Sequence, residues 1–213
     1  MAKQMRRKIK FKKILLIIIV LALLIYLGIF IIKKKKQPVQ AQEVEVIDTI
    51  DDFGYELNDN ETKYYNDLFN KLKDILKEEE YDEQEYATII AKLFLTDFYD
   101  LDNKVMKSDI GGTQFVYENY REDFEKGAKD GIYKYVESNV YGDRKQSLPI
   151  VKEITQENVE NKIFKYNNTS DTNAYYLTMN IEYSKDLGYP TKVEIVLIHN
   201  NNRLEVAKLE TKA

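Results

Sequence analysis

The sequence predicts an α+β domain carried on an N-terminal transmembrane helix. Residues 14–32 form one uninterrupted apolar run between two clusters of basic residues. Further along, apolar residues recur three and four positions apart as far as Val136, and beyond Asn139 they alternate with polar residues. The first spacing is typical of amphipathic helices and the second of half-buried strands. We therefore expect three helices packed on one face of a curved antiparallel sheet of about four strands.

The apolar run is long enough to cross a bilayer. Helical residues rise about 1.5 Å each, and the hydrocarbon core is about 30 Å thick. Only a helix satisfies its own backbone polar groups there, so residues 14–32 are predicted to be a transmembrane helix. The run exceeds the roughly 7–15 apolar residues of a signal peptide. Lys33 to Lys36 also separate it from the small residues at Val39-Gln40-Ala41. These features favour an uncleaved anchor.

The charges on either side orient the predicted helix. Seven basic residues precede it and four follow it. Because positive charge stays cytoplasmic, we expect the N-terminus inside and the rest of the chain outside the cell membrane. The four consecutive lysines resist translocation, which leaves the reverse orientation as an alternative. The predicted parts are a basic cytoplasmic tail (1–13), a transmembrane helix (14–32), a stalk (33–46) and an extracytoplasmic domain (47–213).

The net charge of −4 conceals two oppositely charged parts. Of the 32 basic residues, 11 lie in positions 1–36, which contain no acidic residue. The remaining 21 basic residues face 36 acidic ones, so residues 37–213 have a net charge of −15. An acidic domain is repelled by phosphate backbones, and nucleic acid is therefore not an expected partner. The chain has no cysteine, which excludes disulfides, thiolate metal ligands and a lipid-bearing cysteine.

Three segments have the periodicity of helices. Asn58 and Glu61 have the spacing of a capping box at the start of the first segment. Asp82 is the expected N-cap of the second. Gly127 and Gly131 fall four apart in the third, where small residues allow close packing. The expected helices are residues 58–79, residues 82–98, and a third that starts after Gly111-Gly112 and extends to Val136.

The alternating part predicts neighbouring antiparallel strands. Between Tyr175 and Ser184 every second residue is apolar, which is typical of a strand with one buried face. Three asparagines, residues 200–202, separate two later runs, and asparagine tolerates the positive φ of a tight turn. The expected strands cover residues 149–154, 162–166, 175–184, 192–199 and 204–209.

Two segments carry a resemblance to known proteins. DDFGYELNDNETKYYNDLF (Asp51 to Phe69) and LDNKVMKSDIGGTQFVY (Leu101 to Tyr117) resemble segments of uncharacterised single-pass membrane proteins of low-GC Gram-positive bacteria. The order of anchor, helices and antiparallel strands is similar to that of the nuclear-transport-factor-2-like superfamily. Within it, the layout resembles the inner-membrane assembly subunits of type IV secretion and conjugation systems. The resemblance implies a cone-shaped, cystatin-like domain outside the membrane.

Residues suited to catalysis or metal binding are few. The one histidine, His199, has no acidic or cysteine partner at a motif spacing, so we expect it to be structural. In the acidic stretch after the second helix, Lys104 and Val105 stand where a calcium loop needs a ligand and a glycine. Gly111-Gly112 could hold an anion at a helix N-terminus, but Asp109 beside the pair opposes this. The sequence predicts no catalytic residue, no metal site and no cofactor.

Four residues are candidates for a pocket. Folds of the family that the chain resembles have pockets between the helices and the concave sheet, some with a buried Asp or Tyr. By that resemblance the candidates are Asp97, Tyr99, Asp130 and Tyr133, although all four residue types are also ordinary at core rims and helix surfaces.

Two functions remain open on the sequence. The first is a non-enzymatic module of the cell envelope that docks other envelope proteins through a tyrosine-rich or apolar patch. The second is a domain that binds, or less readily transforms, a small apolar ligand in a pocket of several hundred Å³. In both, the lipid bilayer holds residues 14–32.

Overall fold

The structure is a computed structural model that describes residues 14–16, 18–27 and 44–212. It separates into two units, one of Met1–Gln42 with Val140–Gly142 and one of Glu43–Asn139 with Asp143–Ala213. In the first unit, residues 14–16 and 18–27 are helical and exposed. Within the described ranges, no helix has both the length and the apolar character that crossing a membrane requires.

Parts of the predicted N-terminal organisation lie outside the described residues. These are the tail, residues 1–13, positions 17 and 28–32 of the predicted transmembrane helix, and the predicted stalk up to residue 43. The membrane span and its orientation therefore stay predictions.

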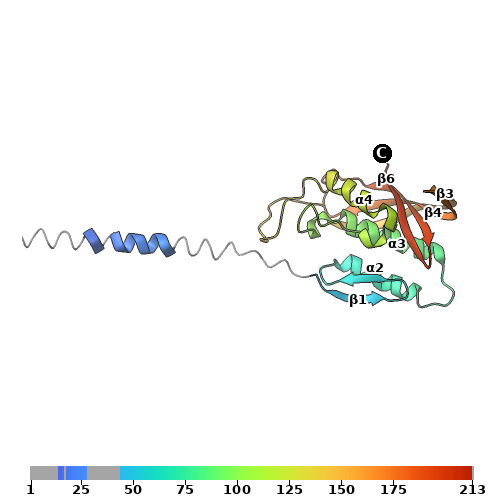
Figure 1. The fold of residues 1–213 in the computed structure, drawn as a ribbon, viewed down its shortest axis with the longest axis horizontal. Coiled ribbons are helices and arrows are strands. Elements are labelled where there is room, and N and C mark those ends of the chain that lie inside the picture. The colour runs from blue at the N-terminus through green and yellow to red at the C-terminus, as the bar shows by residue number, and fades with distance from the viewer. Residues whose placement is uncertain (1–13, 17, 28–43, 213) are drawn as a thin grey trace, which may run out of the picture. The chain divides into compact units, whose positions relative to one another are not determined.

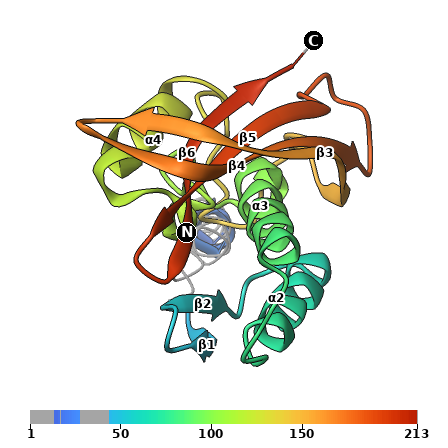
Figure 2. The ribbon, with the colours of Figure 1, turned by 90° about the vertical axis from the view of Figure 1, so that its right-hand side faces the viewer.

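The second unit is an α+β domain with a four-stranded antiparallel sheet, as the sequence predicts. Consecutive strands pair in the order β3-β4-β5-β6. The helix α3 (Glu83–Tyr99) packs against the sheet, and α2 (Lys63–Ile75) packs against α3. Figure 2 shows this arrangement, with α4 (Glu118–Asp130) near the other end of α3. The strands of the sheet are β3 (Val151–Tyr166), β4 (Thr169–Tyr183), β5 (Lys192–Asn200) and β6 (Arg203–Thr211).

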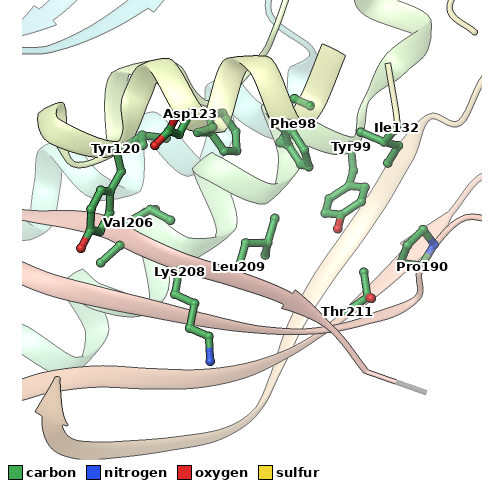
Figure 3. A pocket seen from close by; sticks show the side chains of 15 residues that line it. Phe98, Tyr99, Tyr120, Asp123, Ile132, Pro190, Val206, Lys208, Leu209 and Thr211 are labelled. Carbon is green, nitrogen blue, oxygen red and sulfur yellow. The ribbon is translucent and has the colours of Figure 1, made fainter. Parts of the chain in front are cut away.

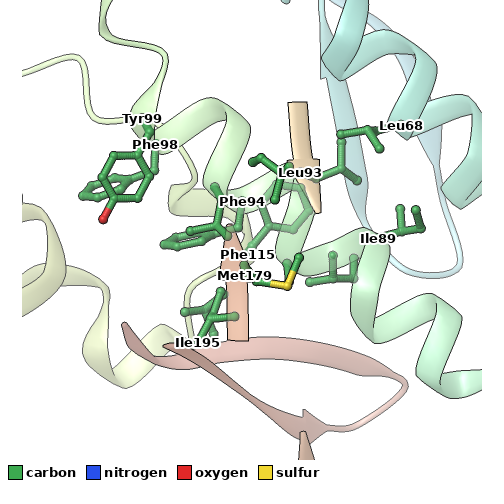
Figure 4. Packing of buried hydrophobic residues seen from close by; sticks show 14 of the residues in the cluster. Leu68, Ile89, Leu93, Phe94, Phe98, Tyr99, Phe115, Met179 and Ile195 are labelled. Carbon is green, nitrogen blue, oxygen red and sulfur yellow. The ribbon is translucent and has the colours of Figure 1, made fainter. Parts of the chain in front are cut away.

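The core fills the space between α3 and the sheet. On β4 the alternating residues Tyr175, Leu177, Met179 and Ile181 are all buried, which confirms the predicted buried face. Apolar side chains of α3 meet them from the helix side, as Figure 4 shows for Leu93 and Phe94. Almost every residue of α3 between Tyr86 and Tyr99 is buried, because the helix has α2 on one side and the sheet on the other.

The first helix begins later than its periodicity suggests. Thr62 is its N-cap, and the Thr62 hydroxyl accepts a hydrogen bond of 3.2 Å from the Tyr65 amide. The expectation that Asn58 caps it is wrong, because Asn58 ends the strand β2 (Tyr55–Asn58). That strand pairs with β1 (Val46–Ile50) in a small separate hairpin that the periodicity did not reveal (Figure 1).

Of the other two predicted helices, one begins where expected and one does not. Asp82 is the N-cap of α3, as expected, and accepts hydrogen bonds from the amides of Gln84 and Glu85. The third helix, α4, is much shorter than the predicted segment. Val116 forms a parallel bridge with Val206 instead of a helical turn, and the helix ends at its C-cap, Gly131. Two short 3-10 helices, Leu101–Asn103 and Thr113–Phe115, connect α3 to this segment.

Within the four-stranded sheet, the expected strands differ from the observed ones most clearly at β3. The two strands predicted at 149–154 and 162–166 are one long strand, β3, whose pairing with β4 shifts register at three points. Such bulges interrupt the alternation of apolar and polar residues, so the sequence reads as two pieces. The turn between β5 and β6 is confirmed, and Asn201 has the positive φ of 56° that asparagine tolerates.

Candidate functional site

A cleft of about 540 Å³ lies between α4 and the C-terminal half of β6. Figure 3 shows α4 on one side of this cleft, which we call the α4–β6 cleft, and β6 on the other. Its lining is mostly apolar and aromatic. Among the lining residues are Phe98 and Tyr99 from α3, Asp123 and Gly127 from α4, and Lys208 and Leu209 from β6.

The sheet topology explains why this cleft stays open. β6 is an edge strand, and the described chain covers that edge at Val206 through the bridge to Val116. The Tyr117 amide also donates to the Val206 carbonyl at 3.0 Å. Beyond this point α4 leaves the sheet, and no other strand of residues 44–212 pairs with the edge. Leu209 therefore faces the space beneath α4.

Gly127 contributes to the same opening. It lies within α4 and lines the cleft, and a Cβ atom added there would meet no atom within 4 Å. The expectation that Gly127 permits close packing is wrong, because nothing packs on it. Gly127 is exposed, and a side chain there would have free space. Gly131 differs, since a Cβ there would lie 2.9 Å from the Gly127 carbonyl oxygen.

Tyr99 supplies a polar group inside the cleft. The residue is 2% exposed, and Figure 3 shows its hydroxyl directed toward β6. Burial raises the pKa of Tyr99 to about 12, so the hydroxyl is a neutral hydrogen-bond donor at physiological pH. Of the charged lining residues, Lys208 bonds Glu210 at 2.8 Å and points away from α4, and Asp123 is exposed at the rim.

Of the four sequence candidates, Tyr99 alone lines the α4–β6 cleft. Asp97 lies instead in a second, polar hollow of about 340 Å³, where its carboxylate forms an ion pair with buried Lys104. Tyr133 is buried between the two hollows, and its hydroxyl donates to the Phe98 carbonyl at 2.7 Å. Asp130 is exposed at the end of α4 and lines neither hollow.

The glycine pair Gly111-Gly112 completes the polar hollow. Gly112 has a φ of +77°, and a Cβ there would lie 2.7 Å from the Phe94 ring. The Gly112 amide donates to the Asp97 carboxylate at 2.6 Å, and the Gly111 amide donates to the Tyr133 hydroxyl at 3.1 Å. An anion is thus held at this pair, but it is a carboxylate of the chain itself.

Glu61 lines the same polar hollow as Asp97. Burial, followed by the repulsion of the Asp97 carboxylate, raises the pKa of Glu61 to about 8. The charge of Asp97 is used to pair Lys104.

His199 has the acidic partners that the sequence did not reveal. Its Nδ1 lies 2.7 Å from Asp171 Oδ2, and its Nε2 lies 3.1 Å from Glu83 Oε1. The Tyr175 hydroxyl bonds the other oxygen of Glu83 at 3.0 Å. Asp171 is 28 residues away along the chain and Glu83 is 116 away, so no motif spacing links them.

The contacts of this network are those of a structural link between elements. It joins the start of α3 to β4 and β5, and both imidazole nitrogens are occupied by carboxylates. Across residues 14–16, 18–27 and 44–212, no group of acidic, histidine or cysteine side chains is arranged to hold a metal ion.

Comparison with known proteins adds no relative. No family model, no curated protein and no solved structure matches the chain. The family resemblance given above therefore stays a prediction, and the α4–β6 cleft must be interpreted from its own geometry.

Proposed function

We propose that the chain is a single-pass membrane protein whose extracytoplasmic domain binds a small apolar molecule in the α4–β6 cleft. The observation that carries the proposal is the cleft itself. Its volume of about 540 Å³ falls within the range of roughly 300–1,000 Å³ that small-molecule sites occupy. Its lining of aromatic and aliphatic side chains, with one buried hydroxyl, is the composition that such sites have.

Membrane attachment and the finer fold belong to the same proposal. The apolar run at residues 14–32 and its basic flanks support an anchor with the N-terminus in the cytoplasm. The order of helices and strands supports a nuclear-transport-factor-2-like or cystatin-like domain. A site beside a membrane is well placed to exchange apolar molecules with it.

The residues of the cleft support ligand binding and not catalysis. Acid–base catalysis needs two groups within hydrogen-bond reach of the reacting atoms. Among the lining residues Tyr99 is the one buried titratable group, because Asp123 is at the rim and Lys208 points outward. The neighbouring Tyr183 donates its hydroxyl to the Pro190 carbonyl at 2.8 Å.

One observation favours docking to envelope proteins as a second candidate. Half-buried aromatic rings follow one another across the outer face of the sheet, with centroids 5.4 to 6.2 Å apart. They are Tyr117, Tyr166, Phe164 and Tyr176, packed on a small cluster that includes Val196. Tyrosine-rich surfaces are frequent at protein interfaces.

If this face docks envelope proteins, the variants Tyr166→Arg and Tyr176→Arg should no longer recover the proteins that co-purify with the wild type from native membranes. Circular dichroism verifies that both variants are folded. The matched control is Glu182→Lys, a change at an exposed residue of β4, the strand that also carries Tyr176. Unchanged recovery with both tyrosine variants would exclude this face as the docking surface.

The cleft proposal is tested by cysteine reactivity, because the chain has no cysteine of its own. Gly127→Cys places a thiol on an exposed residue that lines the cleft, and Lys126→Cys places one on an exposed residue of the same helix that does not line it. Each full-length variant, in lipid nanodiscs, is treated with hexyl methanethiosulfonate and with its trimethylammonium-ethyl counterpart. The measured quantity is the ratio of the two reaction rates at each position.

We expect the apolar-to-charged rate ratio to be at least fourfold higher at position 127 than at position 126. One buried methylene contributes about 0.8 kcal/mol, which corresponds to about fourfold. Partition of the reagents into lipid is the same for both variants and cancels. Equal ratios at the two positions would show that the cleft does not receive an alkyl chain.

A further inference from the structure

The hydroxyl of Tyr99 differs from those of the other fully buried tyrosines. Tyr55 and Tyr86 bond each other at 2.6 Å. The Tyr65 hydroxyl accepts from Gln114 at 3.1 Å, and the Tyr133 hydroxyl is bonded on two sides. The Tyr99 ring is buried like theirs, but its hydroxyl has no hydrogen bond to the described chain and is not one of the fully enclosed unpaired polar atoms, so the hydroxyl oxygen is accessible.

The unpaired hydroxyl of Tyr99 faces the cleft. The Tyr99 hydroxyl is a neutral donor whose oxygen is not enclosed by the chain, so it is free to bond a molecule in the cleft. The Tyr99 ring is fixed against Phe98 with centroids 4.9 Å apart. Figure 3 shows the hydroxyl directed from there into the space beside Leu209. A ligand in the cleft is therefore the group that can accept its hydrogen bond.

The charges around the cleft limit what that ligand can be. A buried anion needs a cation or several donors to offset its desolvation. Lys208 is the one basic lining residue, and its ammonium group is bonded to Glu210 on the outer side of the sheet. Asp123 at the rim repels anions further. The surroundings of Tyr99 thus suit an uncharged acceptor.

We propose that the ligand of the α4–β6 cleft is a neutral apolar molecule with a carbonyl or similar uncharged oxygen that accepts a hydrogen bond from the Tyr99 hydroxyl. This inference rests on the proposed function, since it assigns the ligand class of the same cleft. Phe98, Phe124 and Leu209 surround the apolar body, and Tyr99 orients it through the oxygen.

Three naphthalene probes of similar shape separate the possibilities. 2-Acetylnaphthalene carries a ketone, 2-ethylnaphthalene has the same carbon skeleton without oxygen, and 2-naphthoate carries a charge. Binding is measured by equilibrium dialysis against the full chain in nanodiscs of zwitterionic lipid. Gly127→Leu, which fills the cleft from a position with free space, provides the lipid background.

We expect wild-type protein to bind the ketone about threefold to tenfold more tightly than the hydrocarbon, the range for one hydrogen bond. Tyr99→Phe removes only the hydroxyl and should abolish this preference while it retains binding of 2-ethylnaphthalene. 2-Naphthoate should bind most weakly.

The outcomes separate the two levels of the proposal. If both neutral probes bind and Tyr99→Phe leaves the ketone preference intact, the role of Tyr99 is wrong while the cleft stands. Tighter binding of 2-naphthoate than of the ketone would overturn the neutral ligand class. If no probe binds above the Gly127→Leu background, the proposed function itself fails.

Discussion

The last turn of α3 separates two hollows with opposite character. On one side, Asp97 enters a polar hollow in which its carboxylate is matched by Lys104 and by the Gly112 amide. Two positions later, Tyr99 enters an apolar cleft in which its hydroxyl is matched by nothing in the described chain. Both residues are largely buried, so burial alone does not distinguish them.

The difference lies in how completely the chain pairs these two side chains, although Glu61 in the polar hollow is repelled by Asp97. A buried polar group that is paired within the chain stabilises the fold and has no free hydrogen-bonding capacity for a ligand. The Tyr99 hydroxyl is not enclosed and has no bond to the described chain, so it is free to donate to a molecule in the apolar cleft. The charged candidate, Asp97, is therefore paired within the chain, and Tyr99 is the candidate on which the proposed ligand site depends.

The largest effect is expected when the ion pair is broken from one side. Lys104→Met leaves the Asp97 carboxylate buried without its cation, which should lower the free energy of unfolding by about 3–5 kcal/mol. Chemical denaturation measures it. Lys104→Met combined with Asp97→Asn should recover much of the loss, and no recovery would show that the lysine stabilises by packing alone.

A pH titration tests the same hollow. Burial raises the folded-state pKa of Glu61 from the ordinary 4.5 to about 8, so the folded chain retains a proton that the unfolded chain releases. This contribution to stability is fully present below pH 4.5 and is lost as the pH rises through about 8, a change on the order of a few kcal/mol. Glu61→Gln should flatten the profile in this window. An unchanged profile would place the titration elsewhere.

Gly112→Ala should be the next most severe change. Its left-handed backbone disfavours any side chain, and a Cβ would lie 2.7 Å from the Phe94 ring. Left-handed strain costs about 1–3 kcal/mol, and the overlap adds to this. Thermal unfolding gives the measurement. A stability within about 0.5 kcal/mol of wild type would mean that the loop relaxes freely.

Substitution of one tyrosine hydroxyl beside each hollow compares the two directly. Tyr133→Phe removes a hydroxyl that bonds both the Phe98 carbonyl and the Gly111 amide, and should cost about 1–3 kcal/mol. Tyr99→Phe removes a hydroxyl without a partner and should change stability by less than about 0.5 kcal/mol or raise it. Equal losses, measured by denaturation without ligand, would show that Tyr99 has a structural partner.

The smallest effect is a stabilisation at the cleft. Gly127→Ala adds a methyl group into free space and improves helix propensity, so it should raise the free energy of unfolding by about 0.5–1 kcal/mol. A loss of stability instead would show that α4 packs more closely on β6 than the cleft allows.

Local patterns in the sequence were sufficient for much of the fold. The Asp82 cap, the alternation along β4 and the asparagine turn at Asn201 depend on neighbouring residues, and all three were predicted correctly. Thr62 and Val116 show where such patterns fail. Thr62 follows shortly after the β1–β2 hairpin, whose strand β2 takes up Asn58, and Val116 pairs with Val206 of β6, which lies far away in the chain.

The candidate site was predicted only in part for the same reason. Tyr99 was identified through a family resemblance, but the sequence could not tell a partnered hydroxyl from an unpartnered one. The partners of Asp97 come from positions 104 and 112, while those of His199 come from positions 83 and 171. Such contacts between distant residues leave no periodic signal, and Gly127 gives no sign of whether anything packs on it.

The most direct test is an NMR measurement of where a ligand sits. The full chain with labelled methyl groups, in nanodiscs with 2-acetylnaphthalene, should give intermolecular nuclear Overhauser effects to Leu209 and Ile132 of the cleft. They should persist in Gly127→Ala and disappear in Gly127→Leu. Contacts limited to lipid, or cleft contacts that survive in Gly127→Leu, would contradict the assignment of the α4–β6 cleft as the ligand site.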